Sequence, residues 1–345
     1  MAGETRPPGD RAGVIQDFLS TSGFAKAALD WLAADASFRR YGRLGGGPRP
    51  ALIMDAPPEH EDVRPWLRVA RHLVALGLSA PVVIAEDATA GLLLIEDFGD
   101  DTFTRLLNVG TEEHALYDLA IDVLAALHEH PADQAAPGWL PVYDRQRLLD
   151  EAALFTDWYL PALRGQATGP TEREDYLALM GLALAPAETG ARTLVLRDYH
   201  VDNLMLLKGR KGIVSCGLLD FQDAVAGHPA YDLISLIEDA RRDLGPDVAA
   251  RAEARYFAAR AIPEPEDFAV AAAVLAAARN AKIIGIFTRL ALRDGKHRYL
   301  AMIPRVWRHL EGDLAHPALG PLAAWFDAVV PRDARAVPTV PKETS

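Results

Sequence analysis

Three polar residues in the middle of the chain have the types and spacing to bind a metal and to accept a proton. Asp198 and Asn203 lie in the segment LVLRDYHVDNLMLL, on a polar stretch between two apolar runs that we predict to be strands. Asp220 follows at the end of another apolar run, GIVSCGLLD. Loops between rigid strands hold functional groups in fixed positions. Each residue alone could be a turn former or a helix cap, but the ordered set favours chemistry.

The order is an Asp, four intervening residues, an Asn, a hairpin and a second Asp, which parallels the catalytic loop of kinases. There the first Asp accepts the proton of the substrate hydroxyl, while the Asn and the later Asp bind Mg²⁺. Mg²⁺ prefers oxygen ligands and keeps several waters, so one amide and one carboxylate suffice from the protein. We predict Asp198 as the catalytic residue, Asn203 and Asp220 as ligands of Mg²⁺, and ATP as the phosphoryl donor.

The composition indicates a globular protein that acts on a small molecule. The 345 residues, half of them apolar, suffice for a large core in two lobes. A net charge of −12 disfavours nucleic acid or an anionic membrane as the partner. The single cysteine, Cys216, cannot form an internal disulfide, and we find neither a signal sequence nor an uninterrupted apolar run of about 20 residues. We expect a cytoplasmic monomer.

The apolar periodicity predicts an α+β fold in which a small sheet-rich lobe precedes a larger helical one. The helical lobe is expected to include helices at 112–130 and 268–292, with Pro304 starting or kinking another. The predicted strands of the first lobe, with one helix at 63–76 among them, are 37–43, 51–55, 82–85 and 92–95. In the second lobe we predict strands at 193–196 and 213–219, with a strand or a loop at 204–208 between them.

The predicted boundaries follow these patterns. We expect a disordered N-terminus at 1–12, an ATP-covering lobe at 13–96, a hinge and helical lobe at 97–331, and a flexible tail at 332–345.

The segment LRDYHVDN resembles the HGD-x-H-x-x-N loop of the aminoglycoside phosphotransferase and choline kinase superfamily. Asp198, His200 and Asn203 fall in register, whereas Leu196 and Arg197 replace the first His and the Gly. His200 could support the loop or be a structural histidine.

The resemblance extends downstream and covers nearly the whole chain. Asp220 matches the metal-binding Asp, and Asp232 in PAYDL would brace the catalytic loop. A two-lobed, protein-kinase-like fold with ATP between the lobes is implied. LLLIEDFGD would be the hinge, in which Glu96 and Phe98 bind adenine through backbone groups and Asp97 lies at the pocket rim. A plain solvated linker is the alternative.

Within that superfamily, three segments resemble the bacterial anomeric kinases of N-acetylmuramate and N-acetylglucosamine. These are DASFRRYGRL, LLLIEDFGDDTF and RNAKIIGIFTRLALRDGKHRYL. The resemblance implies phosphorylation of the C1 hydroxyl of an amino sugar, in peptidoglycan recycling. DASFRRYGRL would be the hairpin over the ATP phosphates, with Ser37 at its turn.

The chain departs from the kinase pattern at the strand that should carry a phosphate-binding lysine. Met54 and Asp55 occupy the expected position. The cation must come from elsewhere, and Arg39 or Arg40 on the hairpin is the candidate.

By the same resemblance, the segment from Arg279 to Tyr299 would form a wall of the sugar pocket. Asn280 could bind an acetamido group or a ring hydroxyl, and Arg279, Lys282 or Arg289 could attract the lactyl carboxylate. The acids Glu238 and Asp239 could contact acceptor hydroxyls. All of these could instead be the solvated faces of helices.

Two other functions stay open. An aminoglycoside or amino-alcohol kinase would share the loop, and a nucleotide-binding scaffold without activity is suggested by the missing lysine. The sequence leaves the preferred sugar, the anomer and the oligomeric state undetermined.

Overall fold

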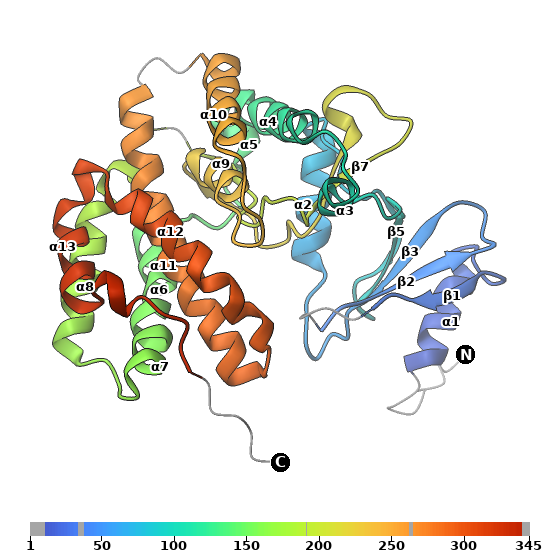
Figure 1. Cartoon of the computed structure of the whole chain (residues 1–345). Coiled ribbons are helices and arrows are strands. Elements are labelled where there is room, and N and C mark those ends of the chain that lie inside the picture. Colours follow the sequence, from blue (N-terminus) through green and yellow to red (C-terminus); the bar gives the residue numbers. More distant parts are fainter. Residues whose placement is uncertain (1–10, 34–37, 191, 262–264, 340–345) are drawn as a thin grey trace. The chain divides into compact units, whose positions relative to one another are not determined.

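A computed structural model describes residues 11–33, 38–190, 192–261 and 265–339 (Figure 1). The chain divides into two compact units, and each is described by itself. The first comprises Met1–Thr111 and Val201–Asp223, and the second Glu112–His200 and Ala224–Ser345. The first unit thus continues past the predicted boundary at residue 96 and includes the segment with Asn203 and Asp220. Ser37 lies outside the described residues, as do 1–10 and 340–345 at the two ends.

The first unit is built on a five-stranded antiparallel sheet. The strand order is β1 (Ala28–Trp31), β2 (Arg40–Gly45), β3 (Ala51–Asp55), β5 (Leu92–Glu96) and β4 (Val83–Asp87). The predicted strands at 51–55 and 92–95 are confirmed because continuous apolar runs mark the buried centre of the sheet. The edge strand β1 was not predicted, since three of its four residues are exposed and the run shows no clear alternation.

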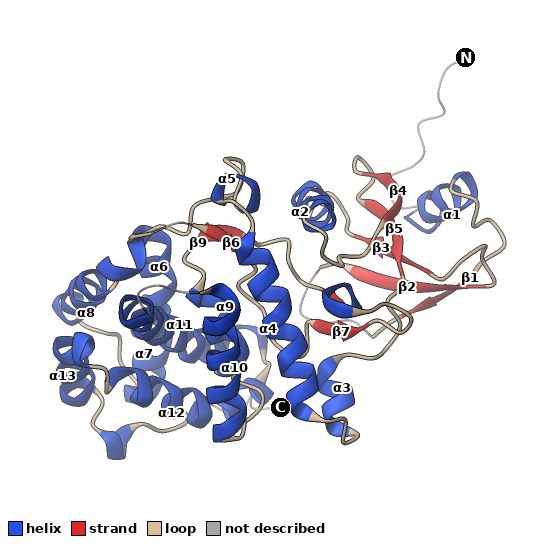
Figure 2. Ribbon diagram, turned by 90° about the horizontal axis from the view of Figure 1, so that it is seen from above, coloured by secondary structure: helices blue, strands red, loops and turns tan. Residues whose placement is uncertain are grey.

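Helices pack on the sheet of the first unit (Figure 2). The helix α1 (Arg11–Thr21) buries Ile15, Phe18 and Leu19 against Ile53 and its neighbours on one face. The sequence placed only a frayed end before residue 13, and α1 begins at Arg11. The helix α2 (Arg64–Ala75) has Pro65 in its first turn and a buried apolar face that begins at Trp66, as its periodicity predicted.

The remainder of the first unit carries the segment with the predicted metal ligands. A short helix, α3 (Phe103–Asn108), precedes it, and β7 (Leu204–Leu206) pairs with β8 (Cys216–Leu218) in a two-stranded sheet. The strand predicted at 213–219 is shorter than expected. Its first half is a 3₁₀ turn, Gly212–Ser215, which is closed by a hydrogen bond from Ser215 Oγ to the Gly212 carbonyl.

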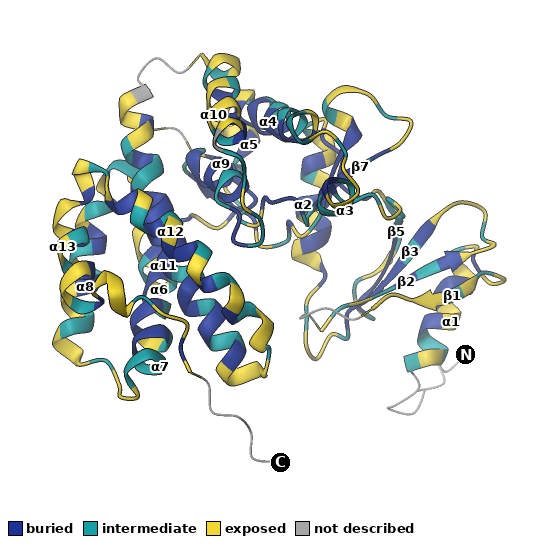
Figure 3. Ribbon diagram, viewed as in Figure 1, coloured by how far each residue is buried: buried dark blue, intermediate teal, exposed yellow. Residues whose placement is uncertain are grey.

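The second unit is mainly helical (Figures 1 and 3). A small sheet of β6 (Thr193–Val195) and β9 (Val225–Gly227) lies among the helices. The first six helices are α4 (Glu113–Glu129), α5 (Ala132–Ala135), α6 (Arg145–Ala152), α7 (Leu160–Arg164), α8 (Pro170–Ala183) and α9 (Ala230–Ile237). The last four are α10 (Pro246–Arg260), α11 (Pro265–Asp294), α12 (Ile303–Leu314) and α13 (Gly320–Val329). The two units confirm the predicted α+β class.

The helix α11 is the centre of the second unit. It packs against α6, α9, α12 and the π-helical turn Phe155–Tyr159. The part from Glu266 to Asp294 is long and apolar enough to cross a membrane, but 67% of its most apolar window is buried inside the protein. This burial identifies α11 as a core helix. Pro304 lies in the first turn of α12 and so begins that helix, one of the two predicted outcomes.

Two glycines on neighbouring helices give a matched test of this packing. A methyl group at Gly285 of α11 would lie 2.3 Å from the carbonyl group of Leu154, whereas one at the exposed Gly312 of α12 would meet nothing within 4 Å. Gly285→Ala should therefore lower the free energy of unfolding by about 1–3 kcal/mol through overpacking. Gly312→Ala should raise it by up to about 1 kcal/mol through helix propensity. Urea denaturation of both variants measures the difference, and equal effects would contradict the close packing of α11.

Candidate active site

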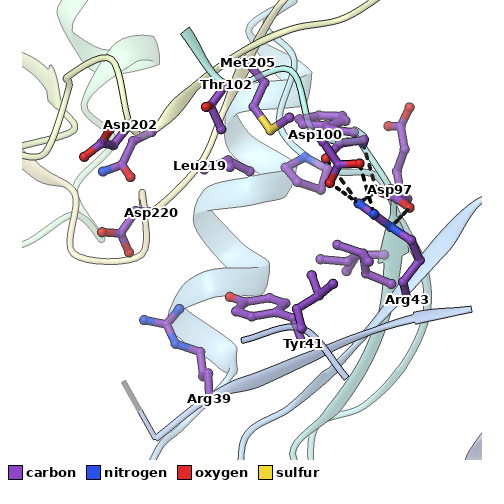
Figure 4. A pocket seen from close by; sticks show the side chains of 18 of the residues that line it. Arg39, Tyr41, Arg43, Asp97, Asp100, Thr102, Asp202, Met205, Leu219 and Asp220 are labelled. Carbon is purple, nitrogen blue, oxygen red and sulfur yellow. Dashed lines mark hydrogen bonds and ion pairs between the residues drawn. The ribbon is translucent and has the colours of Figure 1, made fainter. Parts of the chain in front are cut away.

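A cavity of about 440 Å³ lies within the first unit (Figure 4). Segments that are distant in the sequence line it together: the β2 hairpin, the predicted hinge and the predicted metal segment. This size suits a small ligand or cofactor. The residues that line it include Arg39, Arg40, Tyr41, Arg43, Leu52, Ile95, Glu96, Asp97, Phe98, Asp202, Asn203, Met205, Leu219 and Asp220.

One part of the cavity is apolar and can receive a flat ring. Leu52 of β3 and Ile95 of β5 are direct partners across the sheet, and Met205 and Leu219 come from the later segment. Phe98 packs directly over Gly217, where any Cβ atom would lie 2.8 Å from the phenyl ring. The glycine thus makes room for Phe98 at the cavity.

Ion pairs fix the predicted hinge. The Glu96 carboxylate pairs with Arg210, and the backbone N–H of Glu96 donates to the Val82 carbonyl at 2.9 Å. Arg43 Nε donates to Asp97 Oδ2 at 2.7 Å, and its Nη2 donates to Asp100 Oδ1 at 2.9 Å. The dashed lines in Figure 4 mark these contacts of Arg43. The sequence did not identify Arg43 or Arg210, because each meets its partner only through folding.

The two predicted metal ligands line the same cavity. The Leu219 N–H donates to the Asn203 carbonyl at 3.0 Å, which ties their segments together. Asp220 has a φ of 57°, in the left-handed region that Asp tolerates better than most residues, and its Oδ1 accepts from Gln222 Nε2 at 3.0 Å. Asp202, which the sequence did not single out, also lines the cavity and accepts a hydrogen bond from the Thr104 hydroxyl.

The donor set fits a hard divalent cation. Asn203 offers an amide oxygen and Asp220 a carboxylate, both on the cavity wall. Among the described residues, no three His, Cys, Asp or Glu side chains gather in a way that could hold a metal ion. A two-residue site leaves positions for phosphate oxygens and waters, which is how Mg²⁺ is usually held.

The predicted catalytic loop belongs to the second unit, and Asp232 holds it in place. Asp232 Oδ2 accepts from the Leu196 N–H at 2.6 Å, and Oδ1 accepts from the Arg197 N–H at 2.9 Å. Burial raises the pKa of Asp232 to about 7, and the two N–H donors oppose this shift because they bind the carboxylate form. Ser235 Oγ also donates to the Arg197 carbonyl, at 3.1 Å. Asp198 follows directly.

Arg197 occupies the position where the family loop has Gly. Its φ of 71° is left-handed, which disfavours a residue with a Cβ atom. Its guanidinium pairs with Glu151 of α6 and lies 5.5 Å from the ring centre of Tyr143. Glu151 also accepts from Lys282 Nζ at 2.7 Å. Arg197 and Lys282 therefore share the carboxylate of Glu151, and Arg197 is the residue directly before Asp198.

Three further sugar-binding candidates, Arg279, Asn280 and Glu238, lie together inside the second unit, where Arg279 Nη1 donates to the Glu238 carbonyl at 3.3 Å. Arg279 Nη2 donates to Ser235 Oγ at 3.0 Å. The buried Asn280 donates to Glu238 Oε2 at 2.6 Å and to Asp313 Oδ2 at 2.8 Å. Burial raises the pKa of Glu238 and of Asp313. These contacts account for the burial of Arg279 and Asn280, and their assignment to sugar binding stays a prediction.

His200 is buried in the same unit. Desolvation, with smaller effects from Arg241 and Arg279, lowers the pKa of its imidazole well below 6.5, so the ring is neutral at pH 7. A neutral ring suits the supporting role that the sequence left open.

Residues 31–270 match the family model described as the phosphotransferase enzyme family (APH), and the chain belongs to this family. Solved structures agree in fold. A choline/ethanolamine kinase family protein from Mesorhizobium loti has a TM-score of 0.60 at 13% identity, covering 91% of this chain and 98% of that one. The ADP-bound aminoglycoside phosphotransferase APH(2'')-Ib has a TM-score of 0.58 at 15% identity, covering 88% and 97%. The predicted kinase-like fold is confirmed.

Curated relatives are more similar in sequence. The N-acetylmuramate/N-acetylglucosamine kinase of Caulobacter vibrioides is 39% identical, covering 92% of this chain and 96% of the relative. Proteins of the same name from Pseudomonas aeruginosa and Neisseria meningitidis are 38% and 33% identical, covering 88% and 82% of this chain and 89% and 84% of the relatives. The predicted resemblance is confirmed.

The contacts of Asp232 give a test of the loop. In Asp232→Asn, one oxygen that accepts an N–H becomes an NH₂ group facing that N–H, so the free energy of unfolding should fall by about 1–3 kcal/mol. Asp122 pairs with Arg255 on a more exposed surface, so Asp122→Asn is the matched control and should cost less than about 1 kcal/mol. Urea denaturation compares the two. Equal losses would show that Asp232 does not hold the loop.

Proposed function

We propose that the protein is an ATP-dependent kinase that phosphorylates the C1 hydroxyl of N-acetylmuramate and N-acetylglucosamine. The observation that carries the proposal is the set of curated relatives of that name, which are 33–39% identical to the chain. The cavity of the first unit supports it, since an apolar wall adjoins the oxygen donors of Asn203 and Asp220.

Separate residues would supply the base, the adenine site and the metal ligands of this reaction. Asp198 orients the anomeric hydroxyl and takes its proton as the new O–P bond forms and the bond from the γ-phosphorus to ADP breaks. The apolar wall and the backbone at Glu96 and Phe98 bind the adenine. Asn203 and Asp220 would hold Mg²⁺, which supplies charge neutralisation for the phosphates when it is bound. The product is a sugar 1-phosphate.

Lys282 is the best placed of the predicted sugar ligands. Its side chain is partly exposed and shares Glu151 with Arg197, which leaves an excess of positive charge in this cluster of the second unit. N-acetylmuramate differs from N-acetylglucosamine by a lactyl ether that carries a carboxylate. Lys282 would pair with the lactyl carboxylate of N-acetylmuramate. It would stay paired with Glu151 when N-acetylglucosamine, which lacks that carboxylate, is bound, so one site would accept both sugars. Arg279 and Asn280, which lie on the same helix α11, and Glu238, which directly follows α9, would be further ligands of the sugar.

The proposed reaction has a cellular setting. ATP as the donor favours the cytoplasm, and amino sugar 1-phosphates would return cell-wall fragments to peptidoglycan synthesis. We propose a monomer, because the donor cavity is formed by one chain.

Removal of the proposed base tests the mechanism. Asp198→Asn should lower turnover by about 10²- to 10⁴-fold, because a positioned base contributes that much. ATP affinity and thermal stability should stay close to those of the native protein. Steady-state kinetics and calorimetric ATP titration measure both quantities. Near-normal turnover in this variant would remove Asp198 from the role.

An acceptor panel tests the substrate class. ATP consumption should depend on N-acetylmuramate or N-acetylglucosamine and should be at background level with kanamycin, choline or ethanolamine. Activity with only the cationic acceptors would replace the sugar proposal by an aminoglycoside or amino-alcohol kinase. ATP binding without turnover of any acceptor would favour a nucleotide-binding scaffold.

A further inference from the structure

The strand β3 lacks the lysine that pairs with ATP phosphates in protein kinases. Leu52 is the β3 residue that lines the cavity, while Met54 and Asp55 are fully buried. The Asp55 carboxylate binds Arg11 of α1, whose Nε donates to Oδ1 at 2.8 Å, and it also binds Arg40. Any phosphate-binding cation in this cavity must therefore come from another element.

The Arg40 side chain is held by contacts with two strands of the sheet. Its guanidinium pairs with Asp55 and stacks over the Trp31 ring at 4.3 Å from the ring centre. Half of its side chain is exposed, and its two partners lie on β3 and β1. Arg40 thus neutralises a buried carboxylate, and moving its guanidinium toward a nucleotide would leave Arg11 as the one cation paired with Asp55 among the described residues.

Arg39 lines the cavity, as Arg40 does, but its contacts differ. Only 10% of its side chain is exposed, and its Nε lies 2.7 Å from Glu61 Oε1. Figure 4 shows its guanidinium directed toward the side of the cavity where Asp220 lies. Glu61 comes shortly before α2, the helix that packs on the sheet. An arginine has several N–H donors, so its Nε can bind a carboxylate while its Nη groups reach a phosphate.

Tyr41 connects Arg39 to the predicted metal ligands. Burial raises the pKa of Tyr41 to about 12, the nearby Arg39 opposes this shift, and the charge of Asp220 adds to it. Arg39, Tyr41 and Asp220 all line the cavity, and Figure 4 shows the Tyr41 hydroxyl directed toward the side where Arg39 and Asp220 lie. A cation and a carboxylate at this place suit a ligand that carries phosphates and a divalent metal.

We infer that Arg39, oriented by Glu61, is the cation that binds the ATP phosphates. The Arg39–Glu61 ion pair takes the place of the strand lysine and helix glutamate of protein kinases. The inference rests on the proposed use of ATP but not on the identity of the acceptor. It assigns ligand contact to Arg39 and a positioning role to Glu61, and it leaves Arg40 as a structural residue.

The test compares nucleotide ligands with and without phosphates. Calorimetric titration of the full chain with ATP and with adenosine gives a ratio of affinities for each variant. Arg39→Met should lower the affinity for ATP by about tenfold to a hundredfold, the size of a lost charge-assisted contact. Adenosine affinity should change by less than about threefold. Arg40→Met is the matched control, and its ratio should equal that of the native protein.

Two further variants distinguish a loss of phosphate binding from misfolding of the Arg39→Met protein. Arg39→Lys keeps the charge and should retain part of the preference for ATP. Glu61→Gln should lower kcat more than it weakens ATP binding, because it leaves the cation in place but releases its orientation. An unchanged ratio in Arg39→Met, or a fall confined to Arg40→Met, would overturn the inference. Tight ATP binding without phosphorylation of either sugar would refute the proposed acceptor. The Arg39 assignment would then be decided by the ratio of ATP affinity to adenosine affinity alone.

Discussion

The hydrogen bonds from the backbone of Leu196 and Arg197 to the carboxylate of Asp232 are the constraint on which the predicted catalytic loop depends. They fix two successive peptide groups, so Arg197 stays in a left-handed conformation and Asp198 leaves the turn in one direction. The Arg197 side chain then reaches Glu151 and, through it, Lys282. The buried carboxylate of Asp232 thus fixes the backbone before the proposed base, Asp198, and the partly buried carboxylate of Glu151 binds both Arg197 and Lys282.

In the first unit, too, acidic side chains fix the positions of functional candidates, but there they bind arginine side chains rather than backbone N–H groups. Its cavity has an apolar wall beside polar residues that include the proposed ligands of phosphate and metal, and ion pairs set the positions of the arginines that line it. Arg43 is held by Asp97 and Asp100, and Arg40 by Asp55, whereas Arg39 is oriented into the cavity by Glu61. Three arginines on and directly before β2 therefore have different contacts, which are set by their acidic partners.

The strands, helices and site residues that depend on a local sequence pattern could be predicted. The run at 51–55 became β3, and the spacing of Asn203 and Asp220 put both at one cavity. The largely exposed β1 and the short helix α1 lacked a clear period, and a 3₁₀ turn replaced half of one predicted strand. Glu151 and Glu61 could not be predicted, because each meets its arginine through folding and neither stands in a motif. For the same reason the sequence could not decide between Arg39 and Arg40.

Phosphorus NMR of the reaction product tests the central claim, which is phosphoryl transfer to the anomeric oxygen of an amino sugar. The protein is incubated with Mg-ATP and N-acetylglucosamine or N-acetylmuramate, and the phosphorus–proton coupling identifies the carbon that carries the new ester. We expect ADP and a single sugar phosphate whose phosphorus couples to the anomeric proton. A phosphate on another hydroxyl, or ADP formed without any sugar phosphate, would contradict the account.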